Sequence, residues 1–547
     1  MTSGSANQGA MEEAPAPNET DSNSPATGQP GRFRWKPAVV ILALGIVAHA
    51  SLWQRFSGDR TYEVFSFLYV WPADLFLLGL WWTFASGLAW RSRMIGWGIV
   101  FAVLGTLGAL FRVQDVQGDM VPKIVWRWTP SAEAEAALFW QETDPAANTP
   151  ALATLEISPE DWPEFRGLGR NGVIEHVPPP SEWLAQPLKL LWKHPVGPAW
   201  SSFAIVGDRA WTQEQRHDEE SVVCYDAISG QTVYVHSASA RHESPLGRVG
   251  PRATPTISNG QVFTLGATGI LNCLDARSGA KVWSRNILED ADAGNLPWAM
   301  AGSPLVDDRM VVVNPGGSDG RGVIAYDRDS GEILWTSGNH PAAYAGAKFA
   351  NILGNRQVLI FNGFGLCAFD SEQGTPLWEF AWANSERINV AQPIALSEDR
   401  IFIAAGYGKG GTVVTVTKDG DQVTADSDWT ASQSRQLKLK FNDAVYHDGC
   451  VYGLDEGILT CLDLDTRKRR WKGGRYGYGQ VLLCGKELLV QTEEGEMIAL
   501  EASPAGHQEL SRQRVLDGKC WNQPAIAQGK LFVRNATEAA CYEIIPR

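Results

Sequence analysis

The chain has 547 residues, of which 44% are hydrophobic and 20% are charged, and its net charge at pH 7 is −14. This length exceeds what a single ordinary core uses, so we expect more than one structural region. The acidic balance argues against a nucleic-acid-binding groove, and we expect no nucleic-acid partner. The 55 glycines and 23 tryptophans indicate many tight turns and large packing surfaces between elements.

The N-terminal segment 1–35 is predicted to be a disordered cytoplasmic tail. Residues 1–31 are rich in Ser, Asn, Pro, Gly, Ala and Glu, a composition that cannot bury a core. No apolar run begins near Met1, as the core of a signal peptide would.

Residues 36–112 are predicted to cross a membrane. They contain three apolar stretches, at about 37–53, 68–90 and 94–111, and each is long enough for a membrane helix, which needs about 17–20 apolar residues. Basic residues precede the first stretch and lie between the second and third, which assigns that side to the cytoplasm. We therefore expect a multi-pass protein of the inner (cytoplasmic) membrane, with its N-terminus in the cytoplasm and everything after Phe111 in the periplasm.

Asp74 is the one acidic residue inside these stretches. Intramembrane acids are functional candidates, so one interpretation is a proton site. Because Asp74 follows Trp71 and Pro72, where a helix would begin, we predict instead that it caps a helix near the membrane interface.

Segment 113–160 is predicted to be a connector. Pro130, followed by a run rich in alanine and glutamate, predicts a short helix. The stretch 142–151 is rich in small residues and proline, and we interpret it as a linker.

A thirteen-residue phrase repeats through the rest of the chain. It is clearest at 271–283, LNCLDARSGAKVW, where an apolar run ends in Asp, Gly closes a turn and Trp follows four residues later. The other copies lie at 323–335 and 366–378 and, with losses, at 222–234 and 459–471. The turn and packing residues of these copies are Asp226, Gly230, Asp275, Gly279, Trp283, Asp327, Gly331, Trp335, Asp370, Gly374, Trp378, Asp463 and Trp471.

The spacing of the phrase predicts a β-propeller. The turn acids are 49, 52, 43 and 93 residues apart, and the double step holds a degenerate copy at 413–429 that keeps Trp429. Weaker copies end at Glu501 and Glu543, which makes eight turn positions. A period of about 40–50 residues with about four strands is typical of a propeller blade. In each blade, Asp and Gly would form a hairpin turn and Trp would pack on the neighbouring blade.

The ends of the repeat region indicate how the ring closes. Residues 188–196 read as the Trp strand of a blade without its earlier strands, and the last blade lacks its Trp strand. Counting Trp-type strands, from Trp192 to a weak one near Val515, also gives eight. The first strand would complete the last blade, which removes two sheet edges. The predicted fold is therefore an all-β, eight-bladed β-propeller over 161–547, closed by pairing of its N- and C-terminal strands and preceded by an α-helical transmembrane region of about three helices.

The eight cysteines show no C-x-x-C motif and no adjacent pair. Five of them lie in apolar, strand-like runs, at Cys224, Cys273, Cys367, Cys461 and Cys541. The even count allows disulfides, but we favour small buried thiols on repeat strands. The nine histidines have no metal-binding spacing, so we predict no metal site.

The phrase resembles the A-x-D-x-x-T-G-x-x-x-W repeat of the PQQ-like β-propellers. This family includes quinoprotein alcohol dehydrogenases and the outer-membrane assembly factor BamB. The resemblance covers about 188–547 and implies the propeller fold. The segment DWPEFRGLGRNG at 161–172 also resembles the lead-in of planctomycete proteins of this type.

The resemblance implies two possible functions. Quinoprotein dehydrogenases carry a vicinal Cys–Cys disulfide, a Ca²⁺ site and an Asp base, whereas this sequence has neither adjacent cysteines nor a clustered acidic motif. We therefore expect no catalytic residues, no PQQ and no calcium, with a PQQ-dependent dehydrogenase as the alternative. The BamB group implies a binding or scaffold ring, here with membrane helices in place of a lipobox cysteine, because the first cysteine is Cys224. The expected partner is an envelope protein or a small polar ligand.

The candidate binding site is one mouth of the central channel, where the innermost strands of a propeller begin. Large residues at these starts vary between blades, and aromatics with Arg, Lys and Asn suit a polar or anionic ligand or a peptide. An alternative is that they plug the channel and pair with one another. The predicted residues are Trp200, Arg252, Trp298, Lys348, Arg387, Asn389, Asn442, Tyr478, Trp521 and Asn522.

Overall fold

The computed structural model describes residues 33–56, 60–118, 120–143, 155–244 and 247–544. The chain divides into two compact units, a helical one that ends at Leu110 and a second one that contains Phe111–Arg547. The predicted tail lies outside the described residues up to residue 32, and most of the predicted linker 142–151 also lies outside them.

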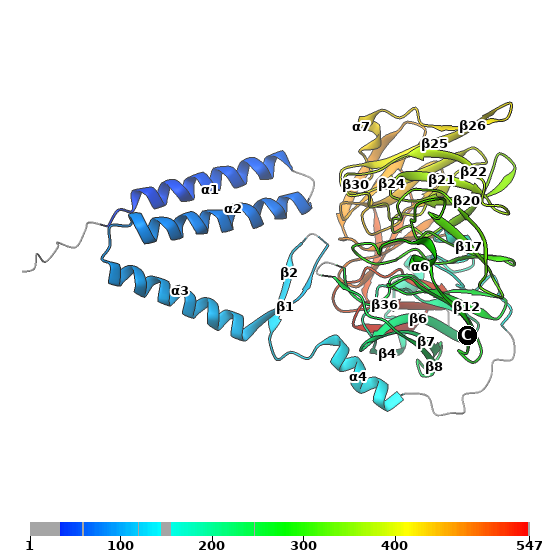
Figure 1. The fold of residues 1–547 in the computed structure, drawn as a ribbon, viewed down its shortest axis with the longest axis horizontal. Helices are drawn as coiled ribbons and strands as arrows, with labels where there is room; N and C mark the ends of the chain where they lie inside the picture. Colours follow the sequence, from blue (N-terminus) through cyan, green and yellow to red (C-terminus); the bar gives the residue numbers. More distant parts are fainter. Residues whose placement is uncertain (1–32, 57–59, 119, 144–154, 245–246, 545–547) are drawn as a thin grey trace, which may run out of the picture. The chain divides into compact units, whose positions relative to one another are not determined.

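The helical unit consists of three long helices (Figure 1). They are α1 (Lys36–Arg55), α2 (Arg60–Leu80) with a π-helical turn at Trp81–Ala85, and α3 (Trp90–Leu110). All three are long and apolar enough to cross a membrane, and the second candidate span is Tyr62–Ala85. The prediction of about three long apolar helices is confirmed, and membrane insertion itself stays a prediction. The second candidate span begins and ends earlier than the predicted 68–90, because Pro72 does not interrupt the helix.

The predicted role of Asp74 as a helix cap is wrong. α2 runs through Pro72, so Asp74 lies inside the helix, where it is 4% exposed. Its carboxylate faces Gly45 of α1, and a Cβ added at Gly45 would lie 2.7 Å from the Asp74 carboxylate carbon. A membrane helix tolerates an internal proline because neighbouring helices can satisfy the freed backbone groups. A proline inside an apolar stretch therefore does not mark the start of a helix.

The second unit begins with a hairpin and a helix. β1 (Phe111–Val116) pairs antiparallel with β2 (Pro122–Trp126), and these strands form a sheet of their own. α4 (Ala132–Thr143) follows where the sequence predicts a short helix. The guanidinium of Arg216, a residue of the propeller, lies 4.7 Å from the ring centroid of Trp140, which fastens α4 to the ring of blades.

Eight antiparallel sheets form the blades of a propeller, and the first strands of neighbouring blades contact one another around its centre. The predicted eight-bladed fold is therefore confirmed. Blade 1 consists of β5 (Ala204–Val206), β6 (Arg209–Arg216), β7 (Glu219–Asp226) and β8 (Thr232–Ser239), and blade 2 consists of β11 (Thr256–Ser258), β12 (Gln261–Leu265), β13 (Ile270–Asp275) and β14 (Lys281–Asn286). Blade 3 consists of β15 (Leu305–Val306), β16 (Met310–Val313), β17 (Val323–Asp327) and β18 (Ile333–Ser337), and blade 4 consists of β19 (Lys348–Ile352), β20 (Asn355–Phe361), β21 (Gly365–Asp370) and β22 (Pro376–Ala381).

The second half of the ring repeats this order, and blade 7 carries β3 (Val173–Ile174) as a fifth strand beside its innermost strand. Blade 5 consists of β23 (Ile394–Ala395), β24 (Arg400–Ala405), β25 (Gly410–Asp419) and β26 (Gln422–Asp426), and blade 6 consists of β27 (Val445–His447), β28 (Cys450–Asp455), β29 (Ile458–Asp463) and β30 (Lys468–Arg475). Blade 7 consists of β31 (Gln480–Cys484), β32 (Glu487–Gln491), β33 (Glu496–Glu501) and β34 (Glu509–Arg514), and blade 8 consists of β35 (Ala525–Ala527), β36 (Lys530–Arg534), β37 (Glu538–Glu543) and β4 (Lys189–Pro195). The remaining short elements are η2 (Leu168–Arg170), α5 (Pro180–Leu184), β9 (Glu243–Ser244), β10 (Arg248–Val249), α6 (Ile287–Ala291) and α7 (Ala431–Ser434).

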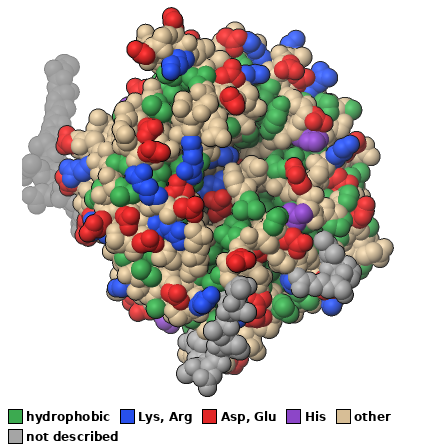
Figure 2. Space-filling model, turned by 90° about the vertical axis from the view of Figure 1, so that its right-hand side faces the viewer, with side chains coloured by type: hydrophobic (Ala, Val, Ile, Leu, Met, Phe, Trp, Pro, Cys, Tyr) green, Lys and Arg blue, Asp and Glu red, His purple; other side chains and the backbone are tan. Residues whose placement is uncertain are grey.

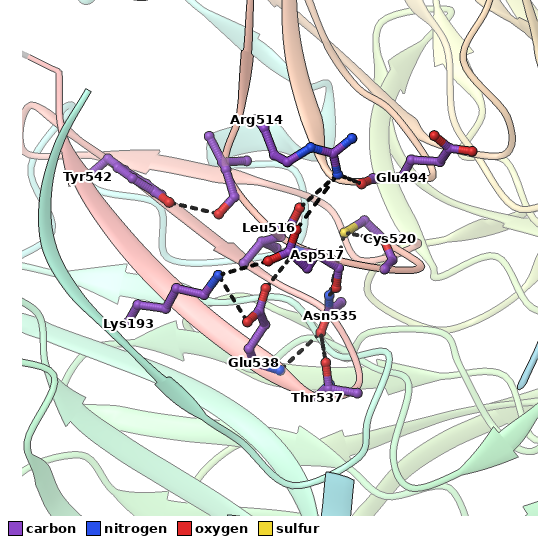
Figure 3. A network of polar contacts seen from close by, with 12 residues as sticks. Lys193, Glu494, Arg514, Leu516, Asp517, Cys520, Asn535, Thr537, Glu538 and Tyr542 are labelled. Carbon is purple, nitrogen blue, oxygen red and sulfur yellow. Dashed lines mark hydrogen bonds and ion pairs between the residues drawn. The ribbon is translucent and has the colours of Figure 1, made fainter. Parts of the chain in front are cut away.

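The ring closes as predicted, by pairing the first propeller strand with the last. β4 runs antiparallel to β37 and places Trp192 opposite Cys541. The Lys193 ammonium lies 3.0 Å from the Glu538 carboxylate and 3.7 Å from the Asp517 carboxylate. Figure 3 shows these three charged side chains pointing toward one another at the closing blade.

The repeated phrase forms the turn that the sequence predicts. In blade 2, the Asp275 carboxylate accepts backbone N–H groups from Arg277 (3.2 Å) and Ser278 (2.8 Å). The N–H of Gly279, at φ 71°, donates to the Asp275 carbonyl at 2.8 Å. The same carboxylate-to-backbone hydrogen bonds occur at Asp226, Asp327, Asp370 and Asp463.

At several blade junctions, the aromatic residue at the Trp position reaches the turn of the next blade. The indole N–H of Trp192 donates to the carbonyl of Ala227 at 3.1 Å, and the hydroxyl of Tyr234 donates to the carbonyl of Ala276 at 3.1 Å. Because each accepting residue directly follows a turn Asp, the phrase joins one blade to the next.

One of the predicted Trp-type strands, at Trp429, differs from the structure. β26 ends at Asp426, so Trp429 lies beyond it, half-buried in a loop. The preceding strand β25 continues to Asp419, because no Asp–Gly turn ends it earlier. In blade 7 the fourth strand ends at Arg514, and Val515 follows it as a buried residue.

All eight cysteines are buried and unpaired, which confirms the predicted buried thiols. Burial raises the pKa of Cys273 and of Cys520 to about 12. These thiols are therefore protonated and unreactive at neutral pH.

Candidate functional site

Six aromatic side chains gather where the innermost strands begin, at one end of the channel. This mouth cluster consists of Trp200, Trp298, Tyr344, Phe441, Tyr478 and Trp521. The Trp521 ring centroid lies 4.9 Å from those of Trp200 and Phe441, and Phe441 lies 5.5 Å from Tyr478 and 6.3 Å from Trp298. At such distances the rings form one continuous aromatic surface.

Two charged side chains lie within the mouth cluster. The Lys519 ammonium is 4.1 Å from the ring centroid of Trp521 and 4.7 Å from that of Trp200. The Glu493 carboxylate accepts the indole N–H of Trp521 at 2.9 Å and the backbone N–H of Tyr478 at 3.1 Å. Burial lowers the pKa of Lys519, and the nearby Asp115 carboxylate opposes this shift.

The tip of the β1–β2 hairpin occupies the mouth cluster. The Lys519 ammonium donates to the Asp115 carboxylate at 2.7 Å and to the Val116 carbonyl at 2.9 Å. Gly118 is buried, and its N–H donates to the Glu493 carboxylate at 2.8 Å. The hairpin tip is therefore bound at this end of the channel, and Figure 1 shows the β1–β2 hairpin beside the ring of blades.

A buried acid, Glu220, and a half-buried cation, Arg252, lie beside the mouth cluster. The Glu220 carboxylate accepts the backbone N–H of Ala267 at 3.0 Å, which links blade 1 to blade 2. Burial raises the pKa of Glu220 to about 7 and lowers the pKa of Arg252 to about 10. The attraction between the two side chains opposes both shifts, but desolvation is the larger effect.

The segment 161–172, here called the lead-in segment, fills the channel with two buried arginines. Arg170 donates to the Ala347 carbonyl at 3.0 Å, and Arg166 donates to the Ala444 carbonyl at 2.9 Å. Both side chains are 1% exposed, and the two carbonyls lie two blades apart in the ring, next to the innermost strands of blades 4 and 6. A guanidinium has five N–H donors, so it can satisfy several carbonyls at once.

The lead-in segment enters from the end of the channel opposite the mouth cluster. The Asp161 carboxylate accepts the backbone N–H of Gly207 at 2.9 Å and the side-chain amide of Gln528 at 3.0 Å. Gly207 and Gln528 lie in turns that follow the innermost strands of blades 1 and 8, far from their starts. On the face turned away from the hairpin, basic and acidic side chains gather around a hollow near the middle (Figure 2).

The structure brings four of the ten predicted site residues together, namely Trp200, Trp298, Tyr478 and Trp521. Arg252 is half-buried beside them, and its guanidinium donates to the carbonyls of Gly247 at 2.8 Å and Arg248 at 3.1 Å. The aromatic members thus pair with one another, as the plugging alternative requires. They also contact a peptide segment of the same chain.

The other predicted residues do not join the mouth cluster. Lys348 is buried with the lead-in segment, where it donates to the Arg170 carbonyl at 3.3 Å, and burial lowers its pKa to about 8. Arg387 is exposed. The amides of Asn389, Asn442 and Asn522 are buried and donate to backbone carbonyls of Asn362, Leu454 and Ser201. Buried backbone carbonyls need such donors, which is why these polar residues recur near the strand starts.

Sequence reasoning missed the residues that complete both ends of the channel. Three of them, Phe441, Tyr344 and Lys519, precede innermost strands. Lys519 lies two residues before the predicted Trp521, so its position in the repeat could have identified it. Glu493 follows the second strand of its blade, and Arg166 and Arg170 lie outside the repeated units. The repeat therefore could not identify these three residues.

The mouth cluster does not fit the calcium-bound quinone that the PQQ-like family implies. Calcium takes about six to eight oxygen ligands. Here Glu493 already accepts N–H groups from Gly118 and Trp521, and the Glu456 carboxylate lies 2.7 Å from the Lys440 ammonium. The hairpin tip also lies against the Glu493 carboxylate, so no catalytic step through a quinone follows from this geometry.

The described residues contain one group of possible metal ligands, His340, Cys367 and Glu379, whose donor atoms lie within 4.8 Å of one another. The His340 ring already hydrogen-bonds with Glu379 at 2.9 Å. Burial raises the pKa of Cys367 to about 12, and a metal ligand would have to be the thiolate. We interpret the group as a polar contact between blades 3 and 4, and the absence of a metal site stays a prediction.

Comparisons with known proteins agree with the propeller fold. The family model described as outer membrane protein assembly factor BamB matches residues 189–297 and 218–473. Outer membrane protein assembly factor BamB of Burkholderia pseudomallei (strain K96243) is 26% identical over 266 residues, which cover 41% of this chain and 65% of that protein. Quinohemoprotein alcohol dehydrogenase ADH-IIG of Pseudomonas putida is 28% identical over 174 residues, which cover 30% of this chain and 24% of that protein. The chain thus spans less than two-thirds of either relative.

A solved structure shows the same fold. The crystal structure of quinohemoprotein alcohol dehydrogenase from Comamonas testosteroni superposes with a TM-score of 0.52 and 14% identity, over 76% of this chain and 85% of that one. At this identity the likeness concerns the propeller alone and leaves the chemistry open.

Proposed function

This chain belongs to the PQQ-like propeller family described as outer membrane protein assembly factor BamB, and from that premise we propose that its ring is a protein-binding module without catalysis of its own. The family match extends over more than half of the residues. The proposal includes the absence of a quinone and of a metal cofactor. The proposed partner is another protein of the cell envelope.

One observation carries this proposal: the mouth cluster binds a peptide segment through a carboxylate and through backbone groups. Lys519 accommodates a carboxylate and a backbone carbonyl, and Glu493 accepts a backbone N–H. Exposed aromatic rings around such polar groups are typical of protein interfaces. Trp200, Trp298 and Trp521 are only half-buried, which leaves aromatic surface for contact.

The proposed location is the inner membrane, with the N-terminus in the cytoplasm and the ring in the periplasm. Three helices long and apolar enough to span a membrane support the anchor. An odd number of spans puts the two ends of the chain on opposite sides, and the basic residues Arg91 and Arg93 favour a cytoplasmic loop between α2 and α3.

Site-specific photo-crosslinking in intact cells tests the binding function. A photoreactive phenylalanine analogue at Trp298 should crosslink to a defined envelope protein. The same analogue at Ile228, which is 54% exposed in a turn of blade 1 away from the mouth cluster, is the matched control and should not. Equal crosslinking at both positions, or none at Trp298, would contradict a binding function at this end of the ring.

The alternative, a PQQ-dependent dehydrogenase, is favoured by the sequence match to the Pseudomonas putida alcohol dehydrogenase. Purified full-length protein supplied with PQQ and Ca²⁺ should reduce no electron-acceptor dye with alcohols or sugars. Dye reduction that depends on both additions would replace the binding proposal with this enzymatic one.

A further inference from the structure

The hairpin tip is bound through sequence-specific features. Lys519 requires an acid at position 115, and Glu493 requires a free N–H at position 118. Gly118 lies so close to the Tyr478 ring that an added Cβ would overlap it, so the site excludes a side chain there. The bound segment therefore has the pattern acid-x-x-Gly in a tight hairpin turn.

The charges of the site also require an acidic occupant. Lys519 has a side chain that is 5% exposed, and its carboxylate partner is Asp115 at 2.7 Å. Arg248 adds a second cation 3.4 Å from the same carboxylate. With the hairpin removed, the ammonium of Lys519 and the guanidinium of Arg248 would both lose this carboxylate. The empty mouth cluster would therefore attract another acidic segment.

The hairpin is held to the blades at its tip and is not built into them. β1 and β2 pair with each other, and they form a two-stranded sheet apart from the eight blade sheets. Val113, Ile124 and Trp126 on these strands are exposed. The tip can consequently leave the mouth cluster without breaking a hydrogen bond of any blade ladder.

We infer that the mouth cluster is a recognition site for acid-x-x-Gly turns, and that the hairpin tip Asp115–Gly118 is a tethered occupant that a partner's turn of the same chemistry displaces. This inference rests on the proposed binding function and names the segment that is bound. A short tether gives the tip an effective concentration on the order of millimolar. A partner must therefore bind tightly, or act when the tip is released, to occupy the site.

A peptide-binding experiment on the full-length protein in nanodiscs tests the inference. The probe is a fluorescent, cyclised peptide of residues 111–126. In the Gly118→Val variant, the new side chain expels the tip from the Tyr478 ring, and the probe should bind at least about tenfold more tightly than to the unaltered protein. Gly420→Val is the matched control, because Gly420 lies at another hairpin turn with open space around it, and it should leave probe binding unchanged.

Two further variants keep the experiment decisive. Asp115→Asn removes the carboxylate from Lys519 and should also raise probe affinity, should Gly118→Val fail to fold. Lys519→Met added to either variant should abolish the gain, and a probe carrying the Gly118→Val change should not bind. Equal probe affinity in all variants would overturn the inference and leave the tip as a permanent anchor. Probe binding without any crosslink at Trp298 would instead refute the proposed envelope partner and retain the turn-recognition site.

Discussion

The indole N–H of Trp283 donates to the backbone carbonyl of Arg328, 2.8 Å away in the next blade. The indole ring also lies on Gly331, which closes the turn that contains Arg328. The glycine therefore serves two purposes: it adopts φ 72°, and it leaves room for the tryptophan of the preceding blade.

Replacing Gly331 with alanine should destabilise the ring more than a left-handed backbone alone explains. A Cβ at Gly331 would lie 2.7 Å from the Trp283 ring, whereas Gly354, at φ 76°, has open space around it. We expect a loss of about 1 kcal/mol for Gly354→Ala, from backbone strain, and about 3 kcal/mol for Gly331→Ala, from strain and overpacking together. Urea unfolding of the two variants measures the difference. Equal losses would show that the Trp–Gly contact contributes nothing.

The sequence predicts the repeat well because its causes are local. The Asp275 carboxylate accepts hydrogen bonds from N–H groups two and three residues away, so the phrase itself contains all the residues that form the turn. Long-range contacts leave no such trace. Lys519 meets Asp115 across 404 residues, and Arg166 meets Ala444 across 278, with no repeated pattern at either end. The helix cap predicted at Asp74 is wrong for another reason: α2 continues through Pro72, so this proline does not mark the start of a helix.

Removing the Arg170 side chain should destabilise the whole ring. Its guanidinium donates to the Ala347 carbonyl at 3.0 Å and to the Glu164 carboxylate at 2.6 Å. Because Arg170 is 1% exposed, water would not readily replace these hydrogen bonds in a variant that lacks the side chain. We expect Arg170→Ala to lower the free energy of unfolding by about 3–5 kcal/mol. Arg321→Ala is the control, because Arg321 makes a long, exposed ion pair of 4.0 Å and should cost less than about 1 kcal/mol. A similar small effect at both positions would show that the lead-in segment does not hold the channel together.

Stability should fall as pH rises through the titration of Glu220. The folded pKa is about 7, above the ordinary value of 4.5, because burial disfavours the carboxylate. Below pH 4.5 the acid is protonated in both states; between 4.5 and 7 only the unfolded state ionises, which favours unfolding. The difference corresponds to about 3 kcal/mol, which is fully lost above pH 7. Arg252 stays charged over this range because its pKa is about 10.

The Glu220→Gln variant isolates this effect. Its amide oxygen can still accept the N–H of Ala267, but it does not titrate. Denaturation at pH 5 and pH 8 should therefore show a smaller loss of stability in the variant than in the unaltered protein. The same pH dependence in both proteins would assign the effect to other groups.

Labelling of single introduced cysteines should establish which side of the membrane each unit faces. The eight native thiols are buried and should stay silent toward a maleimide that cannot cross membranes. Asp421→Cys lies in the exposed turn between β25 and β26 and should react in cells whose outer membrane has been permeabilised. Ser92→Cys, exposed between the basic residues Arg91 and Arg93, should react only after the inner membrane is also opened. Labelling of Ser92→Cys before that step would reverse the proposed orientation, and the mouth cluster would then have to find its partner in the cytoplasm.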